Sequence, residues 1–237
     1  MKKMKIAILL LALALLLCAC NPIEPEATES TDIECGTSES DECSSSFIFE
    51  GIQFDKPVIY LYPEEETEIS VTLRYEGELV CTYPEYENGW RVLAKPDGAL
   101  TNLADGMEYS YLFWEGVCDF TPDLSHGYCI AGKDTASFLR ETLSKMGLSA
   151  REINDFIVYW LPQMQKNPYN LITFQTEIYT DIAALEIIPA PDSILRVFMA
   201  YVPLEAPVDI EAPEILPFER NGFTVVEWGG TVVEENS

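Results

Sequence analysis

The amino-acid sequence predicts an α+β fold, in which an antiparallel, β-rich and sandwich-like body carries an inserted αα hairpin at about residues 134–166. Short segments that alternate apolar and polar residues, separated by Gly, Pro and Asn turns, fill about residues 56–114. They are typical of a small antiparallel sandwich or half-barrel. Two segments with helical apolar spacing follow, and further strand-like segments come after them.

The first 19 residues have the organisation of a bacterial lipoprotein signal peptide. Lysines precede an apolar run at residues 6–19, which is shorter than the roughly 20 residues needed to span hydrocarbon. The sequence LCAC at residues 17–20 resembles the lipobox, whose last cysteine receives acyl chains such as palmitate. We therefore expect Cys20 to anchor the chain to the extracytoplasmic face of the cell membrane. An ordinary secreted protein and an uncleaved membrane anchor are the alternatives.

Residues 20–46 predict a disordered acidic tether rich in Ser and Glu, because they offer almost nothing that a core could bury. The acidic bias extends through the chain, whose formal net charge is −26. Such an excess repels nucleic acid and anionic lipid headgroups, so it argues against a nucleic-acid partner. Cations or basic proteins remain as charged partners.

The folded body is expected to begin near residue 47 with a series of strands. The strands predicted before the helices are residues 56–63, 68–75, 79–83, 90–94 and 107–114. Asn88-Gly89 predicts a tight hairpin that joins the third of these strands to the fourth. The segment 107–114 is apolar on both faces towards its end, which predicts a central strand.

Two helices are predicted next. Asp134 is expected to cap the first, which should end at Gly147. Ser149 and Glu152 have the spacing of a capping box at the start of the second helix, and Pro162 should kink or end it. The strands predicted after the helices are residues 171–178, 183–188, 194–202 and 223–228, of which 194–202 should be central.

These elements predict a single α+β domain over residues 47–232. The alternative is a β subdomain at 55–130 packed on an α+β subdomain at 131–232. The size of either arrangement suffices for a substantial apolar core.

The cysteines suggest disulfides, since an extracytoplasmic location permits them. Cys35 with Cys43 and Cys118 with Cys129 are the candidate pairs, which would leave Cys81 as an odd, buried thiol. No Cys/His spacing for a metal is present, and no cofactor is predicted.

The candidate catalytic residues lie around His126, which is the only histidine. A hydrolase would use His126 as a general base oriented by an Asp, with Ser125 or water as the nucleophile. Glu115, Asp119 and His126 are the candidates for this chemistry. A polar surface loop is favoured, because adjacent Ser and His side chains rarely have the required geometry and no GxSxG, HExxH or SxxK motif is present.

A binding surface is the other candidate. Aromatic residues are plentiful, and an exposed set could stack on sugar rings or on a peptide, although most must belong to the core. Trp90 and Trp114 are the candidate ligand-binding residues. The expected partner besides the membrane is a protein or a glycan.

Three motifs together resemble an uncharacterised family of bacterial secreted and lipid-anchored proteins. They are KPVIYLYPE at 56–64, YSYLFWEG at 109–116 and GFTVVEWGG at 222–230. The resemblance covers about residues 55–230 and implies one evolutionary unit, but no activity and no catalytic residue. The sequence therefore favours a membrane-anchored lipoprotein that presents a binding or structural module, with an extracytoplasmic hydrolase as the alternative.

Overall fold

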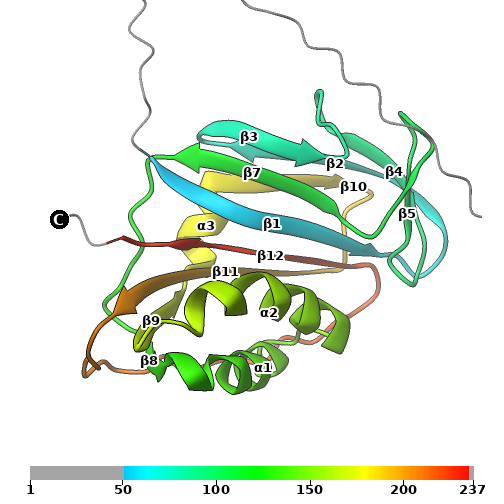
Figure 1. Cartoon of the computed structure of the whole chain (residues 1–237). Coiled ribbons are helices and arrows are strands. Elements are labelled where there is room, and N and C mark those ends of the chain that lie inside the picture. The colour runs from blue at the N-terminus through cyan, green and yellow to red at the C-terminus, as the bar shows by residue number, and fades with distance from the viewer. Residues whose placement is uncertain (1–50, 235–237) are drawn as a thin grey trace, which may run out of the picture. The chain divides into compact units, whose positions relative to one another are not determined.

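The computed structural model of the protein describes residues 51–234, whose strands form a seven-stranded and a five-stranded sheet (Figure 1). The signal peptide, Cys20, the tether at 20–46 and the Cys35–Cys43 pair all lie outside the described residues. The predicted α+β class with an antiparallel, β-rich body is confirmed.

The seven-stranded sheet has the order β3-β7-β1-β12-β11-β9-β8. Its strands are β1 (Ile52–Tyr62), β3 (Glu78–Tyr83), β7 (Leu112–Cys118), β8 (Tyr128–Ala131), β9 (Tyr169–Phe174), β11 (Ser193–Leu204) and β12 (Thr224–Val232). All neighbours pair antiparallel except β11 and β12, which run parallel.

The five-stranded sheet has the order β10-β2-β4-β5-β6 and is antiparallel throughout. Its strands are β2 (Thr67–Tyr75), β4 (Trp90–Ala94), β5 (Leu100–Asn102), β6 (Glu108–Tyr109) and β10 (Ala183–Ile188). In β2, Ile69 and Val71 are fully buried while Glu68 and Arg74 are exposed, as the alternation of the sequence predicts.

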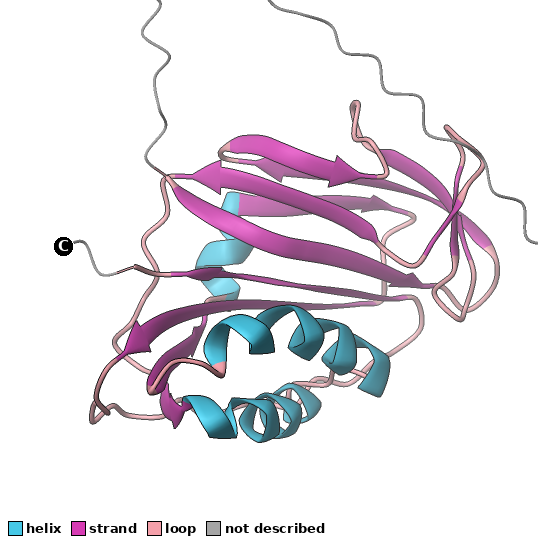
Figure 2. Cartoon of the chain, viewed as in Figure 1, coloured by secondary structure: helices cyan, strands magenta, loops and turns pink. Residues whose placement is uncertain are grey.

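The helices are a 3₁₀ turn η1 (Gly132–Asp134), α1 (Thr135–Lys145), α2 (Ala150–Met164) and α3 (Thr176–Ile182). Helices α1 and α2 form the predicted αα hairpin beside β8, β9, β11 and β12 (Figure 2). One apolar core fills the space between the two sheets, and the other joins α1 and α2 to the opposite face of the seven-stranded sheet.

The start of α2 confirms the predicted capping box. The Ser149 backbone N–H donates to Glu152 Oε2 at 2.7 Å, and the Glu152 backbone N–H donates to Ser149 Oγ at 3.4 Å. The prediction that Asp134 caps the first helix is wrong, because η1 precedes α1 there and the Asp134 side chain makes no capping hydrogen bond. Pro162 lies inside α2, which ends two residues later at Met164.

Three strand predictions are also wrong. The segments at 79–83 and 90–94 form no hairpin, since β3 pairs with β7 and β4 pairs with β2 in the other sheet. The segment 107–114 is divided between β6 and β7, and β7 is the interior strand. The end of the segment 171–178 begins α3 instead of continuing β9. The prediction of 194–202 as a central strand is confirmed, because β11 lies between β12 and β9.

Both halves of the chain contribute strands to both sheets. In the larger sheet β1 pairs with β12, and in the smaller sheet β2 pairs with β10. Residues 55–130 and 131–232 therefore do not form separate sheets.

A long connection joins the parallel strands β11 and β12. Because these neighbours run in the same direction, the chain must return along the full strand length between them. Residues 205–223 do so without helix or strand, and we call this segment the strap.

Candidate functional site

The fold brings the three sequence motifs together on three neighbouring strands. The motif at 56–64 covers most of β1, the motif at 109–116 enters β7, and the motif at 222–230 enters β12. Since β1 lies between β7 and β12, the motifs form one continuous band across the centre of the sheet (Figure 1).

A β-bulge in β1 lies in the middle of this band. Asp55 pairs with Gly230 and Val58 pairs with Trp228, so the register shifts between them. Lys56, inside the bulge, has a φ of 59°, which is uncommon for a residue with a side chain. Its backbone N–H donates to Glu115 Oε1 at 3.2 Å, so β7 supplies a partner for the donor that the bulge frees.

Gly229 makes room for the bulge. A Cβ at this position would lie 3.0 Å from the Cα and Cγ atoms of Pro57. Gly229 of one motif thus accommodates Pro57 of another.

Two carboxyl groups meet beside the bulge. Burial and, to a smaller extent, the charge of Glu115 raise the pKa of Asp55 to about 6. Burial, followed by the charge of Asp55, raises the pKa of Tyr159 and of Tyr201 to about 12 each. A raised carboxyl pKa at a strained bulge is a common feature of functional sites.

Several aromatic side chains lie beside the Asp55–Glu115 pair, on β6, on the edge strand β3 and at the start of β7. Tyr83 of β3 pairs with Phe113 of β7, and its ring lies 5.0 Å from that of Tyr109. Lys56 Nζ lies 4.8 Å from the ring centroid of Tyr111 and 5.0 Å from that of Phe113. We call Tyr83, Tyr109, Tyr111 and Phe113 the aromatic platform.

The platform is accessible to a partner. Tyr83 is 63% exposed and the other three rings are half-buried. Helices α1 and α2 lie beside β12, β11, β9 and β8, and they leave β3 and β7 beyond their edge (Figure 1). Beside the platform, Lys56 and Glu115 supply a hydrogen-bond donor and an acceptor, both half-buried.

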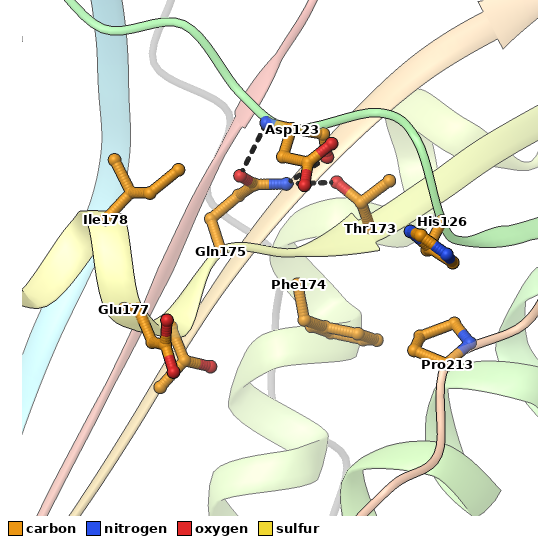
Figure 3. Close-up of a pocket in the computed structure, with 9 residues that line it drawn as sticks. Asp123, His126, Thr173, Phe174, Gln175, Glu177, Ile178 and Pro213 are labelled. Atoms are coloured by element: carbon orange, nitrogen blue, oxygen red, sulfur yellow. Dashed lines mark hydrogen bonds between the residues drawn. The ribbon is translucent and has the colours of Figure 1, made fainter.

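His126 lies in a different part of the molecule, in the loop before β8. Its Nδ1 is 3.0 Å from Ser125 Oγ, and it lines a cavity of about 260 Å³ with Phe174 and Pro213 (Figure 3). The Gln175 amide fixes this loop, because its Oε1 accepts from the Asp123 N–H at 2.8 Å and its Nε2 donates to the Asp123 carbonyl at 2.7 Å. Hydrogen bonds from Ser125 lower the pKa of Asp123.

The candidate residues Glu115, Asp119 and His126 do not converge. Glu115 is on β7, and the His126 loop lies against β9, where Gly127 is packed on Ile172 and Thr173. Three strands separate β7 from β9, a distance of about 19 Å. Asp119 is exposed beyond the end of β7. The arrangement that the alternative of a hydrolase requires is therefore not formed by these three residues.

Trp90 and Trp114 are not surface residues, so their prediction as ligand-binding residues is wrong. Their side chains are 1% and 0% exposed and belong to the core between the sheets. Trp90 Nε1 donates to the Pro84 carbonyl at 2.9 Å, and Trp114 Nε1 donates to Glu227 Oε1 at 3.1 Å. Both indoles are thus satisfied inside the protein.

The cysteine predictions for the described residues are also wrong. Cys118 and Cys129 are free, because four strands lie between β7 and β8 and separate them by about 24 Å, far beyond the reach of a disulfide. Cys118 is the buried thiol, whose pKa burial raises, and Cys81 is exposed on the edge strand β3.

Sequence reasoning missed Asp55, Lys56 and the aromatic platform. One signal could have indicated the bulge, since Pro57 follows Lys56 in a segment that otherwise reads as a strand, and prolines within sheets mark edges or bulges. No sequence signal near Glu115 indicated that its side chain would face the bulge in β1.

Comparison with known proteins finds a partial relative. Over 64 residues the chain is 55% identical to the "Uncharacterized protein in bglA 3'region" of Butyrivibrio fibrisolvens, which covers 26% of this chain and 65% of that protein. The chain thus spans slightly less than two thirds of that relative's length. No family model and no solved structure matches the chain.

Proposed function

We propose that the protein is a bacterial membrane-anchored lipoprotein that presents an extracytoplasmic binding module, and that the aromatic platform contacts a neutral glycan. The main observation in favour of binding is the platform itself, in which the exposed Tyr83 and three half-buried aromatic rings lie beside polar groups at a strained bulge. The resemblance of the three motifs to secreted and lipid-anchored proteins supports the extracytoplasmic location.

The anchor is supported by the sequence. A charged start, a short apolar run and a lipobox-like end precede Cys20, and an acidic stretch separates Cys20 from the body. No helix within residues 51–234 is long and apolar enough to cross a membrane. Several acyl chains on Cys20 would hold the protein stably at the bilayer.

A neutral glycan fits the platform better than a charged polymer does. Aromatic faces offer apolar contact area to a sugar ring, while Glu115 can accept and Lys56 can donate hydrogen bonds to hydroxyl groups. The net charge of −26 repels polyanions. A basic protein is the alternative partner.

Hydrolysis has less support, because Glu115, Asp119 and His126 belong to separate parts of the fold. Besides burial, the charge of Glu115 contributes to the raised pKa of Asp55, and Glu115 also accepts the backbone N–H of Lys56, whose ammonium group lies against the platform. We assign the Asp55–Glu115 pair to ligand contact.

Binding is tested by affinity electrophoresis of the protein in gels that contain soluble glucan, xylan or mannan. We expect retardation by at least one of these polymers and its loss in Tyr83→Ala. Leu103→Ala, which removes an exposed apolar side chain elsewhere, is the matched control and should behave as the unchanged protein. Equal mobility of all forms in every gel, together with cross-linking of Tyr83 to a protein, would favour the protein partner.

Anchoring is tested with Cys20→Ser. Mass spectrometry should find acyl chains on Cys20 of the unchanged protein, and the variant should carry none. An unmodified Cys20 in membranes of the native host would refute the lipoprotein proposal and leave the binding proposal intact.

A further inference from the structure

A second cavity lies under the strap, beside β8, β9 and β11, towards the edge of the seven-stranded sheet that is opposite to β3 and β7. Its volume is about 550 Å³, within the range of cavities that bind small molecules. Apolar side chains from the body and from the strap line it, among them Met146, Phe174, Ile194, Ile215, Leu216 and Phe218.

The strap is fixed on both sides of this cavity. On one side, the Gly127 N–H donates to the Glu211 carbonyl at 3.0 Å, and the Tyr128 hydroxyl donates to the Pro213 carbonyl at 2.8 Å. On the other side, Arg220 Nη2 donates to the Gly147 carbonyl at 3.0 Å, and the guanidinium pairs with Glu152.

Between these attachments the strap is held only by packing. Within residues 51–234, Glu214 to Phe218 make no hydrogen bond to the body. Leu216 is 75% exposed although it also lines the cavity. A ligand that enters can therefore gain apolar contacts from the strap without breaking a hydrogen bond.

The cavity adjoins the smaller one beside His126. Phe174, Thr176, Glu177 and Pro213 line both. We call the two adjoining cavities together the strap groove, which has an apolar part under residues 214–218 and a polar end at Asp123 and His126.

The uncompensated charges along the strap groove are negative. Glu177 and Glu214 line it, and neither belongs to any ion pair in the described part of the chain. Arg196 also contributes to the lining, but its guanidinium is 2.6 Å from Glu227 Oε2 and donates to the Ala183 carbonyl. Its charge is therefore already balanced inside the protein.

We propose that the strap groove binds an amphiphilic cation, a small molecule with an apolar body and a protonated amine. The apolar body lies under strap residues 214–218, and the amine lies between the carboxylates of Glu177 and Glu214. The charge of the lining selects a cation over an anion, and the apolar contacts provide most of the affinity. This site is independent of the aromatic platform.

The test uses the full protein in lipid nanodiscs and a diazirine-bearing octylamine as the probe. Adducts are mapped by mass spectrometry, which separates binding in the groove from partition into lipid. We expect adducts on the strap and on β9, displaced by octylamine. Octanol and octanoate should each compete at least about tenfold more weakly.

Three forms of the protein decide the result. Ile194→Trp fills the groove from a partly exposed position and should abolish the adducts. Glu177→Gln combined with Glu214→Gln should weaken octylamine about tenfold. Glu205→Gln combined with Glu219→Gln removes two exposed strap carboxylates that do not line the groove, and it should bind as the unchanged protein does.

The proposal is overturned if no displaceable adduct forms in the groove, or if Ile194→Trp retains the adducts while circular dichroism shows it folded. Equal competition by octanol or octanoate would refute the cationic selectivity. The cationic selectivity would also be refuted if the Glu205/Glu219 variant lost as much octylamine binding as the Glu177/Glu214 variant. General surface charge would then explain the preference for a cation.

Discussion

Trp114 Nε1 donates a hydrogen bond of 3.1 Å to Glu227 Oε1 and thereby joins β7 to β12 across the intervening strand β1. Glu227 Oε2 accepts from Arg196 Nε at 2.6 Å, and the Arg196 guanidinium lies 4.5 Å from the ring centroid of Tyr179. All four side chains lie in the space between the two sheets. The charge of Glu227 is thus balanced by Arg196, and its other carboxylate oxygen accepts the hydrogen bond of an indole N–H.

Removing one member of the Arg196–Glu227 ion pair should destabilise the folded protein strongly. In Glu227→Ala the guanidinium of Arg196, 7% exposed, would lose its carboxylate, and we expect the free energy of unfolding to fall by about 3–5 kcal/mol. Urea denaturation followed by tryptophan fluorescence measures this. Glu68→Ala, which breaks the exposed pair with Arg91, is the control and should cost less than about 1 kcal/mol. A loss in Glu227→Ala no larger than the control would contradict the assignment.

The raised pKa of Asp55 predicts a pH dependence of stability. Because the folded state raises this pKa from 3.8 to about 6, it favours the neutral carboxyl group. The neutral Asp55 carboxyl group therefore contributes fully to the free energy of unfolding below about pH 4, and this contribution is lost as the pH rises through 6. Asp55→Asn should remove this loss and stabilise the protein at pH 7 by up to about 1 kcal/mol, since Asp55 remains partly solvated.

Thermal unfolding of Asp55→Asn and of Glu65→Gln across pH 4–8 tests this. Glu65 is exposed, so Glu65→Gln should follow the unchanged protein. A profile for Asp55→Asn parallel to that of the unchanged protein would show that another group causes the dependence.

The capping box predicts a measurable loss in Ser149→Ala. Without the hydroxyl, the Glu152 N–H at the start of α2 loses its acceptor, which should lower the free energy of unfolding by about 1 kcal/mol. Ser144→Ala, at an exposed position in the last turn of α1, should change it by less than about 0.5 kcal/mol. Equal effects of the two substitutions would mean that the cap contributes nothing.

The cysteines should differ sharply in reactivity. In the native protein we expect a maleimide to label Cys81 quickly, because its side chain is exposed. Cys118 should react only after unfolding, because it is buried and its pKa is raised. Peptide mass spectrometry assigns the labels, and Cys81→Ser is the control. A peptide that links Cys118 to Cys129 would contradict the strand order.

Much of the local structure could be predicted from the sequence. The spacing of Ser149 and Glu152 specified the start of α2, and the alternation around Ile69 specified the buried face of β2. These features depend on residues a few positions apart, so the sequence contains their causes directly. The αα hairpin and the α+β class follow from the same kind of signal.

The candidate site was predicted much less well. Asn88-Gly89 carries a strong hairpin signal, yet the strands on either side of it enter different sheets. Trp90 and Trp114 were predicted to bind a ligand because aromatic side chains can stack on sugars or peptides, but the sandwich buries them. In each case contacts with distant residues outweighed the local preference.

The sequence by itself determined where helices and most strands form, because apolar periodicity and caps act over one or two turns of chain. Only the tertiary structure decided that β7, β1 and β12 are neighbours. This strand order places Asp55 beside Glu115 and separates Cys118 from Cys129. Strand order depends on which apolar faces can be buried together, and that is a property of the whole chain.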